Sequence, residues 1–279
     1  MAGAGAACDP RGDEPRGQTS GAASANRTET TPDPSLGRWP FQDATEIEPR
    51  VPTRRVRLVL DPGHGAKDNR GNTSSFCVHE EDFTLALAYD VEAALEERGS
   101  FDVVLTRQGS ARVAYADRVA LANGLRADAF VSLHSDVRGK TELWSPRDGL
   151  ECKRAEDAPG FTVLFSDEGT DALAGARKRL GALVARSLLS ASFIAYGGEE
   201  YEGLYEHARD EAGGAEGLFV DRHLPDKRIL VLRRPTVPSI IVETHNALDP
   251  REASRWEDAA TRRAFALALA DALAAFVSG

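Results

Sequence analysis

Apolar runs of strand length alternate with segments of helical period from residue 55 to the end of the chain. The predicted strands are 56–60, 101–105, 129–133, 161–165, 228–232 and 239–242, and the predicted helices are 82–98, 114–125, 171–190 and 256–277. In the first of these helices Leu87, Val91 and Leu95 recur every four residues, and Gly99 follows as a stop signal. This alternation predicts a single α/β domain, with a mostly parallel or mixed central sheet of about six strands and helices on both faces.

The first 54 residues carry almost no periodic apolar pattern and are rich in Gly, Ala, Ser, Thr, Pro, Asp and Arg. Because such a composition buries little apolar surface, we predict a disordered leader or linker over 1–54 and a folded domain over 55–279. The opening residues up to Cys8 resemble the small-residue tail before a lipoprotein cysteine, as if an export signal had been trimmed away. A featureless linker is the alternative.

Two polar segments interrupt the alternation. Segment 138–159 is charged and carries Trp144 and Cys152, and segment 197–214 is strongly acidic. Segments of this length in compact domains are often lids or binding loops, and tolerated surface insertions are the alternative. Cys152 can pair with Cys77 in an oxidising compartment, or both can remain free thiols.

The charge and hydropathy of the chain argue against two classes of partner. The net charge is −10, and the sequence shows no clustered basic surface, so we expect no nucleic-acid partner. No apolar run approaches the roughly 20 residues of a membrane span. The longest candidate, 264–277, is interrupted by Asp271.

Three apolar runs lead into side chains that bind metals or transfer protons, namely His64, His134 and Glu243. The carboxyl ends of parallel strands meet at one edge of a sheet, so we expect these side chains to lie together. Catalytic zinc takes three protein ligands and keeps a position for water, and region 77–82, at the start of the first predicted helix, offers the third ligand. A carboxylate at the end of an apolar strand is costly unless paired or functional, so Glu243 is the candidate proton acceptor.

Six short runs occur in an order typical of one enzyme family. They are D-P-G-H-G, E-x-D-F-T-L, V-x-T-R, A-N-x-x-x-A-D, S-L-H-S-D and V-P-S-I-I-V-E, at 61–65, 80–85, 104–107, 122–128, 132–136 and 237–243. In these runs the chain resembles the zinc-dependent N-acetylmuramoyl-L-alanine amidases, the peptidoglycan amidase family that includes the bacterial cell-division amidases. The resemblance spans 55–278.

Carried over position by position, the resemblance implies one Zn²⁺ per chain held by His64, Glu80 and His134, with Glu243 as general base and acid. Glu80 is preferred to Glu81 because its distance from the following aromatic and leucine positions matches the family's pattern, whereas the residue types alone leave both open. Arg118 and Asn123 match positions that we expect to be structural.

The chain departs from the family pattern directly after Glu243, where it continues Thr244-His245-Asn246. On a continuing strand His245 would share a face with Glu243, as a substrate contact, a support for a metal ligand, or a rival ligand. Asn246 and Asp136 are further candidates for substrate binding or for holding the ligands in place. Segments 138–159 and 197–214 also depart from the pattern, and by analogy with some relatives either could cover the metal.

The resemblance implies hydrolysis of the amide between N-acetylmuramic acid and the L-alanine of the peptidoglycan stem peptide. The alternatives are a zinc peptidase or amidase acting on another peptide, and a peptidoglycan-binding module without catalysis. A phosphate-cradling loop at 63–67 is not expected, because it lacks the Lys-Ser/Thr pair. A peptidoglycan substrate implies a periplasmic or cell-envelope location, and an activator protein is a further partner to consider.

Overall fold

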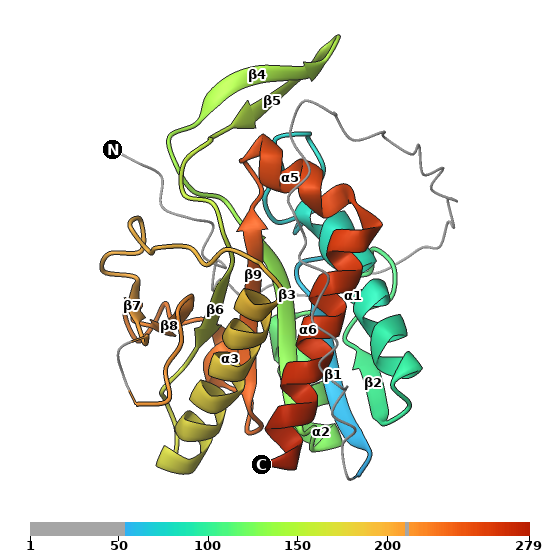
Figure 1. Cartoon of the computed structure of the whole chain (residues 1–279), viewed down its shortest axis with the longest axis vertical. Coiled ribbons are helices and arrows are strands. Elements are labelled where there is room, and N and C mark those ends of the chain that lie inside the picture. Colours follow the sequence, from blue (N-terminus) through green and yellow to red (C-terminus); the bar gives the residue numbers. More distant parts are fainter. Residues whose placement is uncertain (1–53, 210–211) are drawn as a thin grey trace.

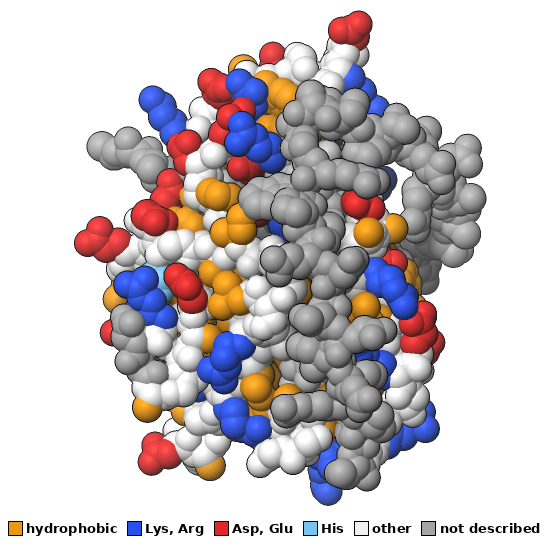
Figure 2. Space-filling view, in the orientation of Figure 1, with side chains coloured by type: hydrophobic (Ala, Val, Ile, Leu, Met, Phe, Trp, Pro, Cys, Tyr) orange, Lys and Arg blue, Asp and Glu red, His pale blue; other side chains and the backbone are white. Residues whose placement is uncertain are grey.

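The computed structural model describes residues 54–209 and 212–279. The expectations for the leader 1–54, apart from its last residue Arg54, and for Cys8 therefore lie outside the described residues. Within the described part, no helix combines the length and apolar character needed to cross a membrane. Acidic and basic side chains are interspersed over the face of the molecule shown in Figure 2.

A mixed sheet of seven strands forms the centre of the domain (Figure 1). Its order is β2-β1-β3-β9-β6-β8-β7, with β1 Val56–Pro62, β2 Phe101–Leu105, β3 Ala129–Asp136, β6 Thr162–Phe165, β7 Tyr205–His207, β8 Leu218–Asp221 and β9 Ser239–Asn246. Strands β2, β1, β3 and β9 are parallel, whereas β9 pairs with β6 and β8 with β7 in antiparallel fashion. The predicted α/β fold with a mostly parallel or mixed sheet is confirmed, with seven strands rather than about six.

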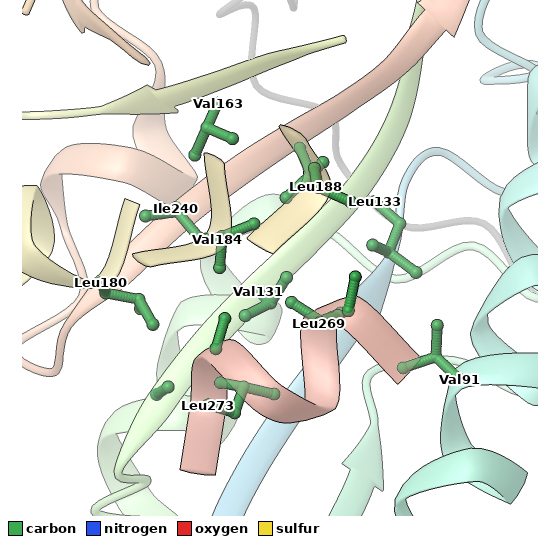
Figure 3. Packing of buried hydrophobic residues seen from close by; sticks show 14 of the residues in the cluster. Val91, Val131, Leu133, Val163, Leu180, Val184, Leu188, Ile240, Leu269 and Leu273 are labelled. Carbon is green, nitrogen blue, oxygen red and sulfur yellow. The ribbon is translucent and has the colours of Figure 1, made fainter. Parts of the chain in front are cut away.

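Helices cover both faces of this sheet. On one face lie α1 Glu80–Glu97, α3 Asp171–Ser190 and α6 Ala259–Ser278, with the short α5 Pro250–Glu257 beside them (Figure 1). Leucines of α3 and α6, such as Leu180 and Leu269, are fully buried against Val131 of β3 and Ile240 of β9 (Figure 3). On the other face, α2 Tyr115–Leu125 and α4 Leu230–Arg233 cover a smaller apolar cluster.

Two predicted elements differ from the observed ones. The apolar run 228–232, predicted as a strand, instead leads into the one-turn helix α4, whose Val231 and Leu232 are buried against the sheet. Short apolar runs do not distinguish a strand from a buried helical turn by periodicity alone. The predicted helix 256–277 is broken at Asp258, which ends α5 in an extended conformation and caps α6 by accepting a hydrogen bond from Ala260 N.

The two segments that interrupt the alternation contain strands of their own. Segment 138–159 forms the hairpin β4 Glu142–Arg147 and β5 Leu150–Arg154, which projects beyond the sheet (Figure 1). A disulfide joins Cys152 of this hairpin to Cys77, in the loop before α1, so the structure chooses between the two states that the sequence left open. Segment 197–214 contains β7 at the edge of the sheet.

Candidate metal centre and catalytic base

The two candidate histidines are delivered by neighbouring parallel strands. His64 lies on the turn that directly follows β1, with a left-handed backbone conformation (φ 61°), and His134 lies near the end of β3. Their rings are 5.0 Å apart between centroids. Gly63 makes this approach possible, because a Cβ at that position would overlap the His134 ring. The D-P-G-H-G run is therefore needed for a tight turn and also for the spacing of the two imidazoles.

Glu80, the first residue of α1, places its carboxylate between the two imidazoles. Glu80 Oε2 is 3.2 Å from His64 Nε2, and Glu80 Oε1 is 2.9 Å from His134 Nδ1. The backbone N–H groups of Asn72 and Ser135 donate to the same carboxylate at 2.9 Å and 3.1 Å. The carboxylate is thus fixed from both sides, and all three candidate ligands are buried.

These three residues fit a divalent metal in their chemistry and in their orientation. Among the described residues they form a group whose ligand atoms all lie within 4.8 Å of one another. The second nitrogen of each ring has its own partner: His64 Nδ1 is 3.0 Å from Asn69 Oδ1, and His134 Nε2 is 3.1 Å from Ser132 Oγ. Such partners fix the ring orientation of metal-binding histidines, and two His with one Glu is a known donor set for catalytic zinc.

The electrostatics of the centre favour an ionised Glu80. Burial by itself would raise the pKa of Glu80, but the charge of His64 and the hydrogen bonds from His134 and His64 outweigh burial and hold the pKa below its ordinary value. Burial likewise opposes protonation of His64, whereas the Glu80 charge outweighs it and raises the pKa of His64. A carboxylate that stays ionised while buried is suited to holding a cation.

A buried ion pair lies beneath the centre. Arg118 Nη1 is 2.6 Å from Asp61 Oδ1, and Ser132 Oγ donates to Asp61 Oδ2 at 2.5 Å. Arg118 also donates to the backbone carbonyl of His64. The structure thus gives Arg118 the structural position that the sequence suggested, as the residue that holds the His64 turn. Sequence reasoning missed the contributions of Asp61 and Ser132, although both lie within quoted motifs.

Glu243 lies on β9, directly opposite His134 in the strand register. Its Oε2 atom is buried and has no hydrogen-bond donor among the described residues. Burial and the neighbouring carboxylates of Asp136 and Glu80 raise the pKa of Glu243 well above its ordinary value, against the opposing charge of Arg138. A carboxylate with a free oxygen and a raised pKa is suited to accept and return a proton.

The predicted placement of His245 on the face of Glu243 is wrong, because β9 contains an irregularity at this point. His134 pairs with Glu243, and the next matched pair is Asp136 with Asn246. Between these pairs β3 advances by two residues, whereas β9 advances by three. An extra residue of this kind is a β-bulge, which turns the following side chains out of the strict alternation.

The His245 ring packs among aromatic side chains instead of joining the metal ligands. It stacks on Trp256 at 5.3 Å with an interplanar angle of 19° and meets Phe83 edge-on at 5.0 Å. Its Nδ1 is 2.9 Å from Thr244 Oγ1. Burial lowers the pKa of His245 to about 3, so the imidazole is neutral at physiological pH.

The Asn246 side chain is hydrogen-bonded within the protein and is not open to a ligand. Its side-chain oxygen accepts from the N–H groups of Arg138 and Leu248, and its NH₂ group donates to the carbonyls of Arg138 and Asp157. These four bonds occupy the side chain's donors and acceptors, so none is left for a substrate. Asn246 thus connects the end of β9 to the residues before β4 and after β5, at the base of the hairpin.

Asp136 lies close to Glu243 and belongs to a small polar cluster. Its Oδ1 accepts from Val137 N at 2.7 Å, and its Oδ2 accepts from the Tyr201 hydroxyl at 2.5 Å. Burial raises the pKa of Asp136 against the charge of Arg138, whose Nε is 3.5 Å away. Sequence reasoning missed Tyr201, which comes from segment 197–214 and is brought here only by the fold.

The model of the N-acetylmuramoyl-L-alanine amidase family matches residues 58–275. The chain belongs to this family. The resemblance inferred from the six motifs is thereby confirmed. The probable N-acetylmuramoyl-L-alanine amidase AmiB of Haemophilus influenzae is 28% identical over 236 residues, which cover 80% of this chain and 52% of AmiB. The chain therefore spans about half the length of that relative.

Solved amidase structures share the fold. Ami1 of Mycobacterium smegmatis is 21% identical with a TM-score of 0.60, and the match covers 81% of this chain and 98% of Ami1. The CwlD amidase of Clostridioides difficile, solved in complex with the GerS lipoprotein, is 15% identical with a TM-score of 0.56 and is covered to 99%, over 80% of this chain. At these identities the likeness concerns the arrangement of strands and helices.

Proposed function

We propose that this protein hydrolyses the amide bond between N-acetylmuramic acid and the L-alanine of peptidoglycan stem peptides, and that residues 55–279 are its catalytic domain. The position of Glu243 carries the proposal: the residue is half-buried, its Oε2 atom is buried without a hydrogen-bond partner among the described residues, and it lies directly opposite a candidate metal ligand. Membership of the amidase family supports the same reaction.

The metal that fits the site is Zn²⁺, one per chain, held by His64 Nε2, the Glu80 carboxylate and His134 Nδ1. Three buried nitrogen and oxygen donors from this residue set are typical of catalytic zinc sites. When bound, zinc supplies polarisation of the substrate carbonyl and a lowered pKa for a water molecule. The chain's own contribution is to fix the three donors before the metal arrives, through Asn69, Ser132 and the backbone amides around Glu80.

Glu243 is proposed to move the proton. With its raised pKa, the carboxylate accepts a proton from the attacking water through Oε2 and then delivers it to the amine nitrogen that leaves as the N-terminus of L-alanine. Asp136 and Arg138 set the charge around Glu243 in opposite directions, and Arg118 and Asp61 hold the His64 turn. None of these four residues is proposed to bond to the reacting atoms.

Two other functions are less well supported. A catalytically inactive peptidoglycan-binding module would not need a buried carboxylate oxygen without a partner, such as Glu243 Oε2, which is costly without a function. A zinc peptidase or amidase with another peptide substrate would use the same centre, so only the products distinguish it from the proposed enzyme.

A peptidoglycan substrate implies that the protein works outside the cytoplasm, in the periplasm or cell envelope. An activator protein is a candidate partner, because the related CwlD amidase is in complex with a lipoprotein in its structure. The mixed surface charges in Figure 2 offer no extended basic face among the side chains visible there, and a nucleic-acid partner is not proposed.

The test is incubation of the zinc-loaded protein with purified peptidoglycan, followed by mass spectrometry of the products. We expect stem peptides that begin with L-alanine, their loss with a chelator, and their return when zinc is added back. Cleavage inside the stem peptide would instead support the peptidase alternative. Binding to peptidoglycan without new amine ends would support the binding module.

A further inference from the structure

Tyr201 anchors segment 197–214 near the carboxyl end of the central strand β9, where Glu243 lies. Its ring is buried among three aromatic rings, at centroid distances of 5.1 Å from Tyr196, 4.6 Å from Tyr205 and 5.2 Å from Phe219. Its backbone N–H donates to the carbonyl of Gly198, which forms a turn around it. The segment is therefore packed into the domain at this residue and is more than a surface insertion.

The Tyr201 hydroxyl connects two strands across a third. It donates to Asp136 Oδ2 of β3 at 2.5 Å, and it lies 3.1 Å from Thr162 Oγ1 of β6. Thr162 is the register partner of Glu243 on one side, and His134, two residues before Asp136, is its partner on the other. The hydroxyl thus connects β3 and β6, the two strands on either side of β9, close to Glu243 in the register.

The direction of these hydrogen bonds is fixed by the charge around the phenol. Burial and the neighbouring Asp136 carboxylate raise the pKa of Tyr201 well above 10, so the phenol keeps its proton. The phenol donates this proton to Asp136 Oδ2, and its oxygen is left to accept from Thr162 Oγ1. Each of the two hydrogen bonds then has one direction, so the bridge favours a single geometry.

A second contact ties the same segment to the loop after β3. Glu200 Oε2 accepts from the backbone N–H of Gly139 at 2.7 Å, and the backbone N–H of Glu200 donates to the Tyr196 hydroxyl at 2.7 Å. Glu200, the residue before Tyr201, is therefore held at both its side chain and its backbone, which leaves the phenol little freedom to move away from Asp136.

We propose that Tyr201 is a positioning residue for Glu243, and that the described residues around it, 197–209, thereby form part of the catalytic site. The Tyr201 bridge fixes the ends of β3 and β6 relative to each other, and the Glu243 carboxylate lies between them on β9. This inference rests on the proposed function, since it assigns Glu243 the proton transfer.

The experiment compares Tyr201→Phe, which removes only the hydroxyl, with Tyr89→Phe, the same change at an exposed side chain of α1. We expect kcat on peptidoglycan to fall about 10- to 100-fold in Tyr201→Phe, with KM and zinc content unchanged, because small misplacements of a catalytic group are costly. Tyr89→Phe should match the parent protein. An unchanged kcat, or a raised KM with full kcat, would overturn the positioning role.

Thr162→Val provides a second arm, because it removes the other end of the bridge. If Tyr201 acts through the bridge, the loss in the double variant Tyr201→Phe with Thr162→Val will be smaller than the product of the two single losses. Independent, multiplicative losses would contradict the bridge.

A spectroscopic arm separates this inference from the proposed function. In protein labelled with ¹³C at glutamate carboxyls, the Glu243 resonance is assigned by its absence in Glu243→Gln. We expect Tyr201→Phe to shift this resonance and Tyr89→Phe to leave it in place, whether or not the parent protein cleaves peptidoglycan. An unmoved resonance would refute the positioning role even if the amidase activity is established.

Discussion

His134 of β3 and Glu243 of β9 lie opposite each other in the register of two parallel strands at the centre of the sheet. One is a candidate metal ligand and the other the candidate base, so the backbone ladder sets their spacing. Sites built on core strands hold their geometry more closely than sites built on loops. The remaining ligands come from the β1 turn and from the first residue of α1, which are held by Arg118 and by backbone N–H groups.

Glu243→Gln is expected to keep the metal and lose nearly all turnover. The amide has the size of the carboxylate but cannot accept the proton, and proton transfer of this kind contributes about 10²- to 10⁴-fold to rates. Product release from peptidoglycan measures the loss, and elemental analysis measures zinc. A Glu243→Gln protein that remained active would show that another group is the base.

The sequence predicts much of this arrangement because its signals are local. Each of the three apolar runs that lead to His64, His134 and Glu243 is a core strand, and the turn chemistry around Gly63 is written in the D-P-G-H-G run. The choice of Glu80 over Glu81 came from family resemblance alone. In the structure the start of α1 directs the Glu80 carboxylate between the imidazoles.

The features that the sequence could not predict depend on contacts between distant segments. The bulge that turns His245 toward Phe83 and Trp256 appears only when β9 pairs with β3. Tyr201 reaches Asp136 across 65 positions of sequence. The helical turn α4 replaces a predicted strand because packing, which short apolar runs do not encode, decides between the two.

Glu80→Gln and Glu81→Gln form a matched pair for the metal site. Glu80 lies between the two histidines, whereas Glu81 Oε1 lies 3.5 Å from Arg70 Nε. We expect Glu80→Gln to lower zinc affinity at least about 10-fold, because losing a residue that only supports a metal ligand already costs that much. Glu81→Gln should leave the zinc affinity near the parent value. Isothermal titration calorimetry with zinc measures the affinity of each variant. The reverse ranking would assign the ligand to Glu81.

The acid limb of the pH–rate profile should report Glu243. The base must be ionised, and its pKa is raised above the ordinary 4.5, so the rate should fall as pH drops through that raised value. Asp136→Asn removes a negative neighbour and lowers the pKa of Glu243, which moves the limb to lower pH. Arg138→Met removes a positive neighbour and moves it to higher pH. Shifts in the same direction for both variants would contradict this assignment.

The disulfide between Cys77 and Cys152 is expected to stabilise the domain, since it closes a loop between residues 75 positions apart. Loss of such a cross-link costs about 2–4 kcal/mol of unfolding free energy. We expect Cys77→Ser, Cys152→Ser and the double variant to lose the same amount in urea unfolding, because either single change breaks the bond. A double variant much less stable than either single variant would show that the thiols contribute separately.

His245 should make the stability of the fold depend on pH. Its pKa is about 3 in the folded protein, against 6.5 for an unperturbed imidazole. Between these values the unfolded chain binds a proton that the folded chain refuses, so the free energy of unfolding falls as the pH drops from 6.5 toward 3, by up to about 1.4 kcal/mol per pH unit. His245→Phe keeps an aromatic ring against Trp256 and Phe83 and removes this titration. Urea unfolding of both proteins at pH 7 and pH 5 should therefore show a smaller loss of stability for the variant. Equal losses would mean that the imidazole is protonated in the folded state.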